Sequence, residues 1–163
     1  KVDEGLQKLM NDMLETMYAA PGIGLAAIQV GVPKRVIVLD IGWRNKLEST
    51  DDEKQVVRKN PMYFVNPEII TKSTNNSTYE EGCLSVPGQF AEIERPDKCH
   101  IKYLDYYGQS KELVAEDMLA TCIQHEIDHL EGILFIDYLS KLKKSMIVKK
   151  LTKQKEQLDR IVI

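Results

Sequence analysis

The sequence predicts one domain that combines helices and strands, with helices near both ends and strands between them. Three patterns indicate this. Apolar residues recur at helical spacing near the start, strand-like apolar runs lie between Arg35 and Ala115, and a second helical pattern begins at Glu116. The chain has 163 residues, 43% of them hydrophobic and 29% charged, which suits a globular protein with one core. No apolar run is as long as a membrane span, and three cysteines without a disulfide-framework spacing favour a reducing compartment.

The first helix is expected from Asp3 to Tyr18, where apolar residues recur at i, i+3, i+4 and i+7. Pro21 and Gly22 end it. The run GIGLAAIQVG follows, and its glycines let the backbone approach a ligand or another segment closely, although a turn and a buried strand would explain them equally. Gln29 is the polar residue of this run. Its amide is either satisfied by backbone groups or free to bind a substrate, and the stretch alone leaves both open.

Strand patterns occupy the middle of the chain. The segment from Arg35 to Ile41 reads as a buried strand, and the charged segment from Trp43 to Asn60 reads as an exposed loop. A second strand is expected over Met62–Lys72, where Pro67 indicates either an edge strand or a bulge. A polar turn is expected over Ser73–Thr78.

A hairpin is expected further on. Cys99–Tyr107 and Lys111–Ala115 read as its two strands, with a turn at residues 108–110 between them. His100 alternates with the apolar face of the first strand, so we expect it at the surface or half-buried.

The run EGCLSVPG contains Cys83 between a glycine and an apolar residue. Such a cysteine is often a small core residue. Here Pro87 and Gly88 follow closely, which indicates a tight, irregular segment that directs backbone N–H groups into a site.

The most informative stretch is QHEIDH in the helix that begins at Glu116 and ends before Gly132. His125 and His129 are four residues apart, so both imidazoles lie on one helix face and can bind one metal ion, with Glu126 placed to handle a proton. A solvated helix face is the alternative. Apolar residues at helical spacing beside the histidines favour a buried helix with a polar seam: Leu119, Ile123, Ile127 and Leu130.

Two histidines need a further protein ligand to form a catalytic metal site. The extended zinc-peptidase pattern HExxHxxGxxH fails, because Phe135 stands at its last position. Glu156 lies in a basic tail, which is a poor setting for a metal ligand. Cys83 is the better candidate, since thiolates bind soft and borderline metals well.

The three stretches GIGLAAIQVG, EGCLSVPG and QHEIDHLEG, in this order, resemble the signature motifs of peptide deformylases of the bacterial type with a helical C-terminus. The resemblance covers nearly the whole chain. It implies an α+β fold in which antiparallel β-sheets pack around a central metal-binding helix, with an N-terminal and a C-terminal helix. It also implies a single domain over residues 1–163, with a further N-terminal segment expected before Lys1.

The resemblance implies a role for each site residue. Cys83, His125 and His129 would bind the metal and leave a fourth position for water, and Glu126 would be the general base and then the acid. Gln29 and the backbone N–H of Leu84 would hold the developing oxyanion. The expected substrate-binding residues include three that line a methionine pocket with Ile23, namely Met118, Thr121 and Cys122. The others are Gly22, Gly24, Glu81 and Gly82.

The implied activity is removal of the formyl group from N-formylmethionine at the start of new polypeptides. The implied cofactor is one divalent metal ion, natively Fe²⁺, with Zn²⁺, Ni²⁺ or Co²⁺ as alternatives. A monomer in the bacterial cytoplasm is expected, with nascent peptides as partners and no membrane association. Phe90 departs from the family pattern, where a basic residue is frequent, and the loop from Trp43 to Asn60 is longer than usual.

Two other functions remain open from the residues alone. A zinc endopeptidase shares HExxH but would lack its third ligand here. A structural metal site in a binding protein would need a fourth ligand, which could only be Cys99, Cys122 or His100.

The C-terminal tail is unusually basic. Residues 139–163 contain eight Lys or Arg and two acidic residues, a net charge of +6, so the rest of a chain of net charge −3 carries −9. We expect a helix here, which is either a solvated face or a docking element for the phosphates of ribosomal RNA.

Overall fold

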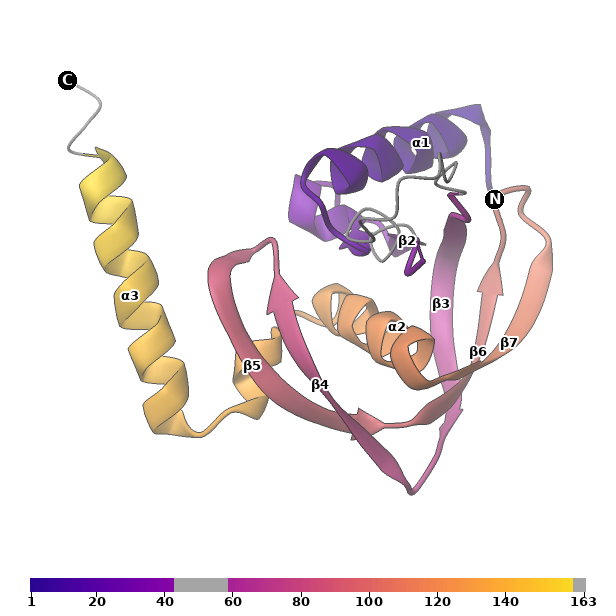
Figure 1. The fold of residues 1–163 in the computed structure, drawn as a ribbon. Helices are drawn as coiled ribbons and strands as arrows, with labels where there is room; N and C mark the ends of the chain where they lie inside the picture. The colour runs from indigo at the N-terminus through magenta and orange to yellow at the C-terminus, as the bar shows by residue number, and fades with distance from the viewer. Residues whose placement is uncertain (43–58, 160–163) are drawn as a thin grey trace, which may run out of the picture.

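The computed structural model describes residues 1–42 and 59–159. Its first element is an amphipathic helix, α1 (Glu4–Ala19) (Figure 1). Asp3 caps this helix by accepting a hydrogen bond from the Leu6 N–H at 2.8 Å. The buried face of α1 recurs at the spacing that the sequence predicted: Leu6, Met10, Met13 and Met17.

Five antiparallel strands form the main sheet in the order β1-β2-β3-β6-β7. Strand β2 is buried on both faces. Val36 and Val38 pack with α1, whereas Ile37 and Leu39 pack in the cluster that contains the central helix. Alternate side chains of β2 therefore point to opposite faces of the sheet and pack in two apolar layers, one on each side of it. The bounds are β1 Gly24–Ala26, β2 Val36–Leu39, β3 Met62–Lys72, β6 Lys98–Leu104 and β7 Ser110–Glu116.

Strand β3 shows what the proline in its sequence does. The register with β6 shifts between Val65 and Glu68, around Pro67, so the bulge expected there is present. The strand lies between β2 and β6, so the alternative of an edge strand was wrong.

Strands β4 (Asn76–Cys83) and β5 (Val86–Pro96) form a separate two-stranded ribbon that curves beneath the central helix (Figure 1). The polar turn expected over Ser73–Thr78 is shorter than predicted, because β4 already begins at Asn76. The irregular segment expected around Cys83 is a turn of two residues between strands, with a register shift at Gly82 and Cys83. No strand was predicted where β4 and β5 lie.

Helix α2 (Asp117–Leu130) runs between the five-stranded sheet and the ribbon. Ala120, Ile123 and Ile127 join the core cluster of the main sheet. Gly132 follows with φ +74°, a left-handed conformation that ends the helix as predicted. The α+β arrangement of antiparallel sheets around a central helix is thus confirmed.

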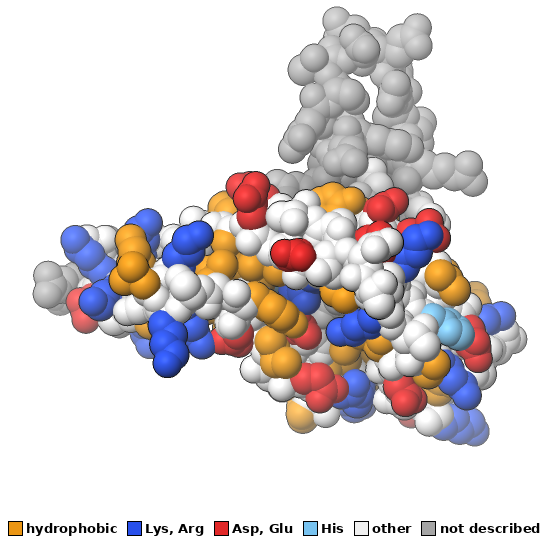
Figure 2. Space-filling model, turned by 90° about the horizontal axis from the view of Figure 1, so that it is seen from below, with side chains coloured by type: hydrophobic (Ala, Val, Ile, Leu, Met, Phe, Trp, Pro, Cys, Tyr) orange, Lys and Arg blue, Asp and Glu red, His pale blue; other side chains and the backbone are white. Residues whose placement is uncertain are grey.

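A short helix, η3 (Phe135–Tyr138), connects α2 to the last helix, α3 (Lys141–Asp159). Helix α3 projects from the body and contacts it through Ile147 and Leu151 (Figure 1). Its Lys side chains gather over its surface at the left of Figure 2. Residues 43–58 and 160–163, which hold most of the expected loop and the end of the tail, lie outside the described residues. Within the described part of the chain, no helix has both the length and the apolar character that crossing a membrane needs.

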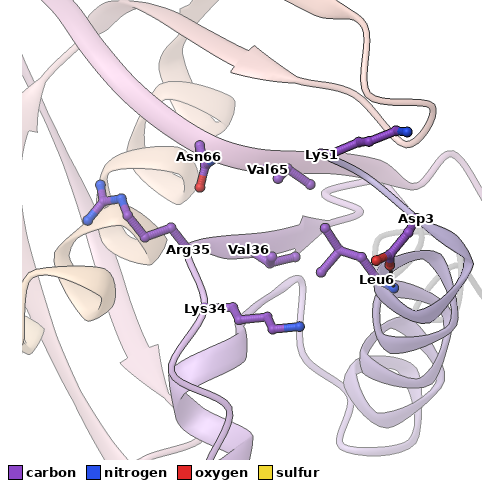
Figure 3. A pocket seen from close by; sticks show the side chains of 8 residues that line it. All are labelled: Lys1, Asp3, Leu6, Lys34, Arg35, Val36, Val65 and Asn66. Carbon is purple, nitrogen blue, oxygen red and sulfur yellow. Dashed lines mark hydrogen bonds between the residues drawn. The ribbon is translucent and has the colours of Figure 1, made fainter.

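A cavity of about 290 Å³ lies between the start of the chain and strands β2 and β3 (Figure 3). Its lining includes Lys1, Asp3 and Lys34, and contains neither cysteine nor histidine. Among the described residues, this cavity therefore offers no thiolate or imidazole to a metal ion.

Candidate metal centre

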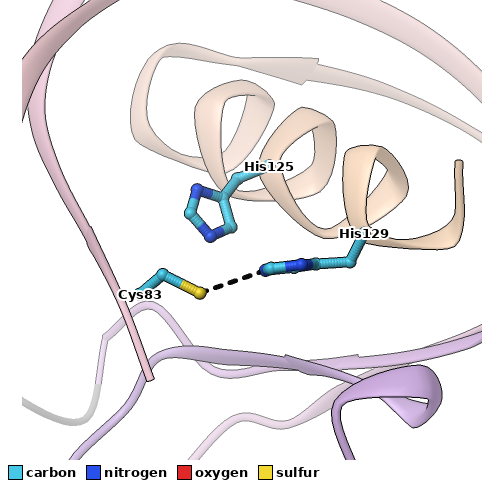
Figure 4. Close-up of side chains that lie close together, drawn as sticks. All are labelled: Cys83, His125 and His129. Atoms are coloured by element: carbon cyan, nitrogen blue, oxygen red, sulfur yellow. Dashed lines mark hydrogen bonds between the residues drawn. The ribbon is translucent and has the colours of Figure 1, made fainter. Parts of the chain in front are cut away.

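Helix α2 and strand β4 bring three potential metal ligands together (Figure 4). His125 and His129 lie one turn apart on α2, and both are buried. Cys83 is the last residue of β4, and its Sγ lies 3.2 Å from His129 Nε2. The ligand atoms of the three residues all lie within 4.8 Å of one another, so a single ion could contact all of them. The prediction that Cys83 lies beside the two histidines matches the geometry.

The charges of this cluster suit a cation. Burial alone would raise the pKa of Cys83, but hydrogen bonds with His125 and His129 outweigh it and lower the pKa to about 5. Burial would lower the pKa of His125, yet hydrogen bonds with Cys83 and Glu81 raise it to about 10. A thiolate therefore faces a protonated imidazole, and a divalent cation can take the place of that proton.

Glu81 sets the orientation of His125. Its Oε1 lies 2.7 Å from His125 Nδ1, which leaves the other ring nitrogen to face Cys83. A carboxylate behind a histidine in this way is the usual support of a metal-binding imidazole. The donor set and its support thus fit a divalent metal ion.

A buried arginine, Arg95 of β5, holds Glu81 in place. Its Nε and Nη2 donate to the two oxygens of Glu81 at 2.6 and 2.9 Å, and its Nη1 donates to Asp128 at 2.7 Å. The ring of Tyr138 covers the guanidinium at 4.7 Å, and its hydroxyl donates to Asp128 at 2.7 Å. The sequence analysis predicted none of these contacts of Arg95, Asp128 and Tyr138.

Glu126 lies beside the ligands with a buried side chain. Burial is the main cause that raises its pKa to about 7. Its Oε2 has no hydrogen-bond partner among the described residues. Gly24 of β1 makes room for it, because a Cβ built there would lie 2.6 Å from Glu126 Oε1. The carboxyl group is therefore poised to exchange a proton near neutral pH.

Gln29 lies in the short helix η1 (Ala27–Val30), and its amide meets the first of the two alternatives that the sequence left open, because it is held by the backbone. Its Oε1 accepts a hydrogen bond from the Ala26 N–H at 2.9 Å, so the backbone fixes the amide. Its Nε2 donates to Ser85 Oγ at 3.1 Å and lies 3.6 Å from Cys83 Sγ. The amide donor is thus held at the metal ligands.

A cavity of about 660 Å³ opens over this cluster. Every predicted site residue except His129 lines it, including Leu84 in the turn after Cys83. The residues expected to contact substrate are all among its walls: Gly22, Ile23, Gly24, Glu81, Gly82, Met118, Thr121 and Cys122.

Comparison with known proteins identifies the family of this chain. A sequence model of the family described as polypeptide deformylase matches residues 1–145. The chain belongs to the peptide deformylase family. Members of the family remove the N-formyl group from nascent peptides, so the enzyme class indicated by the three motifs is confirmed.

Individual deformylases agree in sequence and in fold. The peptide deformylase of Pelagibacter ubique (strain HTCC1062) is 64% identical over 157 residues, which cover 96% of this chain and 84% of the relative. The crystal structure of the peptide deformylase from Ehrlichia chaffeensis is 43% identical with a TM-score of 0.82, covering 95% of this chain and 86% of that one. A second structure of the Ehrlichia deformylase holds actinonin and matches with a TM-score of 0.81, 43% identity and coverages of 94% and 86%.

Proposed function

We propose that this member of the family deformylates N-formylmethionine at the start of new polypeptides with Cys83, His125 and His129 holding one divalent metal ion. The observation that carries the proposal is the cluster of these three ligands directly beside a cavity that Glu126 and Gln29 line. When bound there, a divalent cation supplies a Lewis acid that makes water nucleophilic at neutral pH. We propose Fe²⁺ as the native ion, with Zn²⁺, Ni²⁺ or Co²⁺ as substitutes, because one thiolate and two imidazoles suit all four.

Glu126 moves the proton in this proposal. A carboxyl group with a pKa of about 7 can accept a proton from the attacking water and return it to the departing amine. Its Oε2, which has no hydrogen-bond partner in the described part of the chain, is available for this transfer. The amine must leave protonated, because an amide anion is far too basic to leave at neutral pH.

The oxyanion that forms at the formyl carbon needs fixed donors. The Gln29 amide is fixed by the Ala26 N–H and lies next to Cys83. The backbone N–H of Leu84 directly follows the same ligand in the chain. We assign these two groups to the oxyanion.

Recognition of the substrate divides between a pocket and two strand edges. Ile23, Met118, Thr121 and Cys122 line the part of the cavity that we assign to the methionine side chain. Strand β1 is at the edge of its sheet, and β4 pairs only with β5 among the described strands. An extended peptide could add to these edges, with Gly22, Gly24 and Gly82 assigned to its binding because they line the same cavity.

Glu81 receives a different role from the substrate contact first expected. Both of its oxygens are engaged by His125 and Arg95. We therefore assign Glu81 to the orientation of His125.

We further propose that the chain acts as a monomer in a bacterial cytoplasm and meets its substrates at the ribosome through α3. Bacterial relatives and the lysines of α3 support this.

The test is a deformylation assay on a formyl-Met peptide with protein purified without oxygen and its metal content measured. We expect turnover that tracks the content of bound metal, and loss of turnover after chelation. A protein that binds metal through Cys83 but releases no formate from any formyl-Met peptide would contradict the proposal. Full activity after Cys122→Ser, with metal retained, would also exclude a closed structural site.

A further inference from the structure

A buried carboxyl group lies directly behind one wall of the large cavity. Asp40 follows strand β2 and is only 1% exposed. It does not line the cavity, but its chain neighbour Ile41 does, and so does Ile23, whose carbonyl it contacts. Burying a carboxyl group is costly unless it is paired, so the contacts of Asp40 show what it does for the fold.

Asp40 fixes both ends of a short stretch of the cavity wall, which we call the wall segment (residues 20–24). Every residue of this segment lines the cavity. Tyr18, just before the segment, donates from its hydroxyl to Asp40 Oδ2 at 2.6 Å. Near the other end, the Ile23 carbonyl accepts a hydrogen bond from the Asp40 N–H at 2.9 Å. One residue therefore holds the segment between helix α1 and strand β1.

The same carboxyl group also reaches the chain that leads into β3. Its Oδ2 accepts a second hydrogen bond, from the Asn60 N–H at 2.9 Å. The Asp40 side chain is directed to α1 through Tyr18, whereas Ile41 packs against the apolar cluster that contains residues of α2. Ile23 packs against that cluster too. Asp40 thus ties three segments together immediately behind two apolar side chains of the cavity wall.

The pairing of this carboxyl group is uneven. Oδ2 receives both donors, while Oδ1 is buried and has no hydrogen-bond partner among the described residues. Burial, and then the hydrogen bond to Asp40, raise the pKa of Tyr18, so its hydroxyl keeps its proton and remains the donor. A buried oxygen without a partner costs stability. Asp40 is therefore a poor stabiliser of the core, which favours a role in positioning.

We propose that Asp40 is a positioning residue for the methionine pocket, which holds Ile23 and Ile41 where the methionine side chain needs them. The inference rests on the proposed deformylase activity and on the assignment of Ile23 to that pocket. Without the carboxyl group, the wall segment loses its tie to α1, and the pocket loses contact with a long apolar side chain. A side chain too short to reach this wall is affected much less.

The experiment compares kcat/KM for two peptides that differ only in their first residue, formyl-Met and formyl-Ala, on enzyme of measured metal content. Asp40→Ala should lower the Met-to-Ala ratio by about five- to tenfold, since the contacts of even one methylene are worth about tenfold or more. The loss should appear mainly in KM for the formyl-Met peptide. An unfolded or metal-free fraction lowers both rates equally, so a merely structural role would leave the ratio unchanged.

Two milder variants and a control assign the effect. Tyr18→Phe removes one of the two hydrogen bonds at Oδ2 and should lower the ratio in the same direction, by about two- to threefold. Asp40→Asn keeps an acceptor oxygen and should preserve most of the ratio. The control, Asn11→Ala, removes another hydrogen bond of α1, to the Tyr106 hydroxyl at 3.1 Å, and should leave the ratio unchanged. Neither Asn11 nor Tyr106 lines the cavity.

An unchanged ratio in Asp40→Ala would make Asp40 a structural residue only. If that variant does not fold, an unchanged ratio in Tyr18→Phe leads to the same conclusion. An equal loss in Asn11→Ala would assign the effect to the general stability of α1, and a loss in Asp40→Asn as large as in Asp40→Ala would overturn the role of the acceptor oxygen. No turnover of the formyl-Met peptide by the unmodified, metal-loaded enzyme would overturn the proposed function itself.

Discussion

The three cysteines of the chain sit in contrasting surroundings. Burial raises the pKa of Cys99 to about 11 and that of Cys122 to about 12, so both remain thiols at neutral pH. Cys83 is half-buried, and contact with the two histidines lowers its pKa to about 5 despite that burial. Only Cys83 should be a reactive thiolate at pH 7.

Metal-free protein treated with iodoacetamide at pH 7 should therefore be alkylated at Cys83 alone, as mass spectrometry of its peptides would show. Because the pKa of Cys83 is lowered to about 5, the rate of its alkylation should stay level as the pH falls from 9 and decline only near pH 5. Added Zn²⁺ should protect the sulfur. Alkylation of Cys122 at the rate of Cys83, or no protection by Zn²⁺, would argue against Cys83 as a ligand.

Glu126 carries the proton in our proposal but is not a ligand. Glu126→Gln preserves the size of the side chain and removes the exchangeable proton. Metal content should stay the same while kcat falls by about 10²–10⁴, the usual contribution of general acid–base catalysis. A fall of less than tenfold, with full metal content, would remove Glu126 from the proton transfer.

Gln29 is needed mainly when charge develops on the formyl oxygen. Gln29→Leu should lower kcat by about 10²–10³ and change KM much less, since one oxyanion donor is lost. Steady-state kinetics on a formyl-Met peptide separates the two constants. An effect confined to KM would mean that Gln29 only binds the ground state.

At the level of elements, strand β5 supplies the support of the metal centre through Arg95. The side chain of Arg95 is 3% exposed, and its guanidinium bridges Glu81 on β4 and Asp128 on α2. Arg95 thus ties the ribbon to the central helix just behind His125.

Arg95→Met should destabilise the protein by about 3–5 kcal/mol, because it leaves the Glu81 carboxylate buried without its partner. It should also speed the transfer of bound metal to a chelator. Arg35→Met is the matched control. Arg35 pairs with Glu131 at 2.6 Å, but both side chains are about half exposed, so its loss should cost less than about 1 kcal/mol. Chemical denaturation and chelator kinetics measure both effects. Equal losses in the two variants would show that Arg95 has no special role.

The elements that could be predicted from the sequence are those with a clear apolar period. Helix α1 and the β6–β7 hairpin bury mainly one face, so their apolar residues recur visibly, and α2 keeps apolar residues at helical spacing although it is buried on all sides. Strand β5 was missed because its burial is sparse and Pro87 and Gly88 stand at its start.

In the candidate site, too, the residues that a local pattern marks were predicted and the others were not. His125 and His129 were predicted because a helix fixes their spacing, and Cys83 was found by its chemistry. Arg95 could not be found in this way, because its partners lie 14 and 33 residues away and no local pattern links them.

Across the whole molecule, charge is divided between the body and the tail. Residues 139–163 carry +6 against −9 for the remainder. Six of the seven lysines of α3 are exposed, whereas Lys144 pairs with Asp137. Among the described residues, no lysine or arginine lines the large cavity, and α3 contributes nothing to its lining, so the basic surface and the site are distinct.

This separation lets the proposed ribosome contact be tested without disturbing the site. Truncation after Lys144 would remove Ile147 and Leu151, which pack against the cluster of Phe135 and Ile136. Charge neutralisation is cleaner: Lys to Gln at four exposed positions of α3 that leave this packing intact, namely Lys149, Lys150, Lys153 and Lys155. The control makes the same change in net charge elsewhere on the surface, at Lys34, Lys72, Lys102 and Lys111.

Both variants should hydrolyse a free formyl-Met peptide like the unmodified enzyme, because none of the eight lysines lines the cavity. The α3 variant alone should sediment less with ribosomes at low salt. Its binding should also depend less steeply on salt, since fewer counterions are released from the RNA. If the two variants and the unmodified protein sediment equally at low salt, α3 is a solvated helix and the enzyme reaches nascent chains without it. A loss shared equally by both variants would instead mean that net charge, and not the α3 surface, governs the contact.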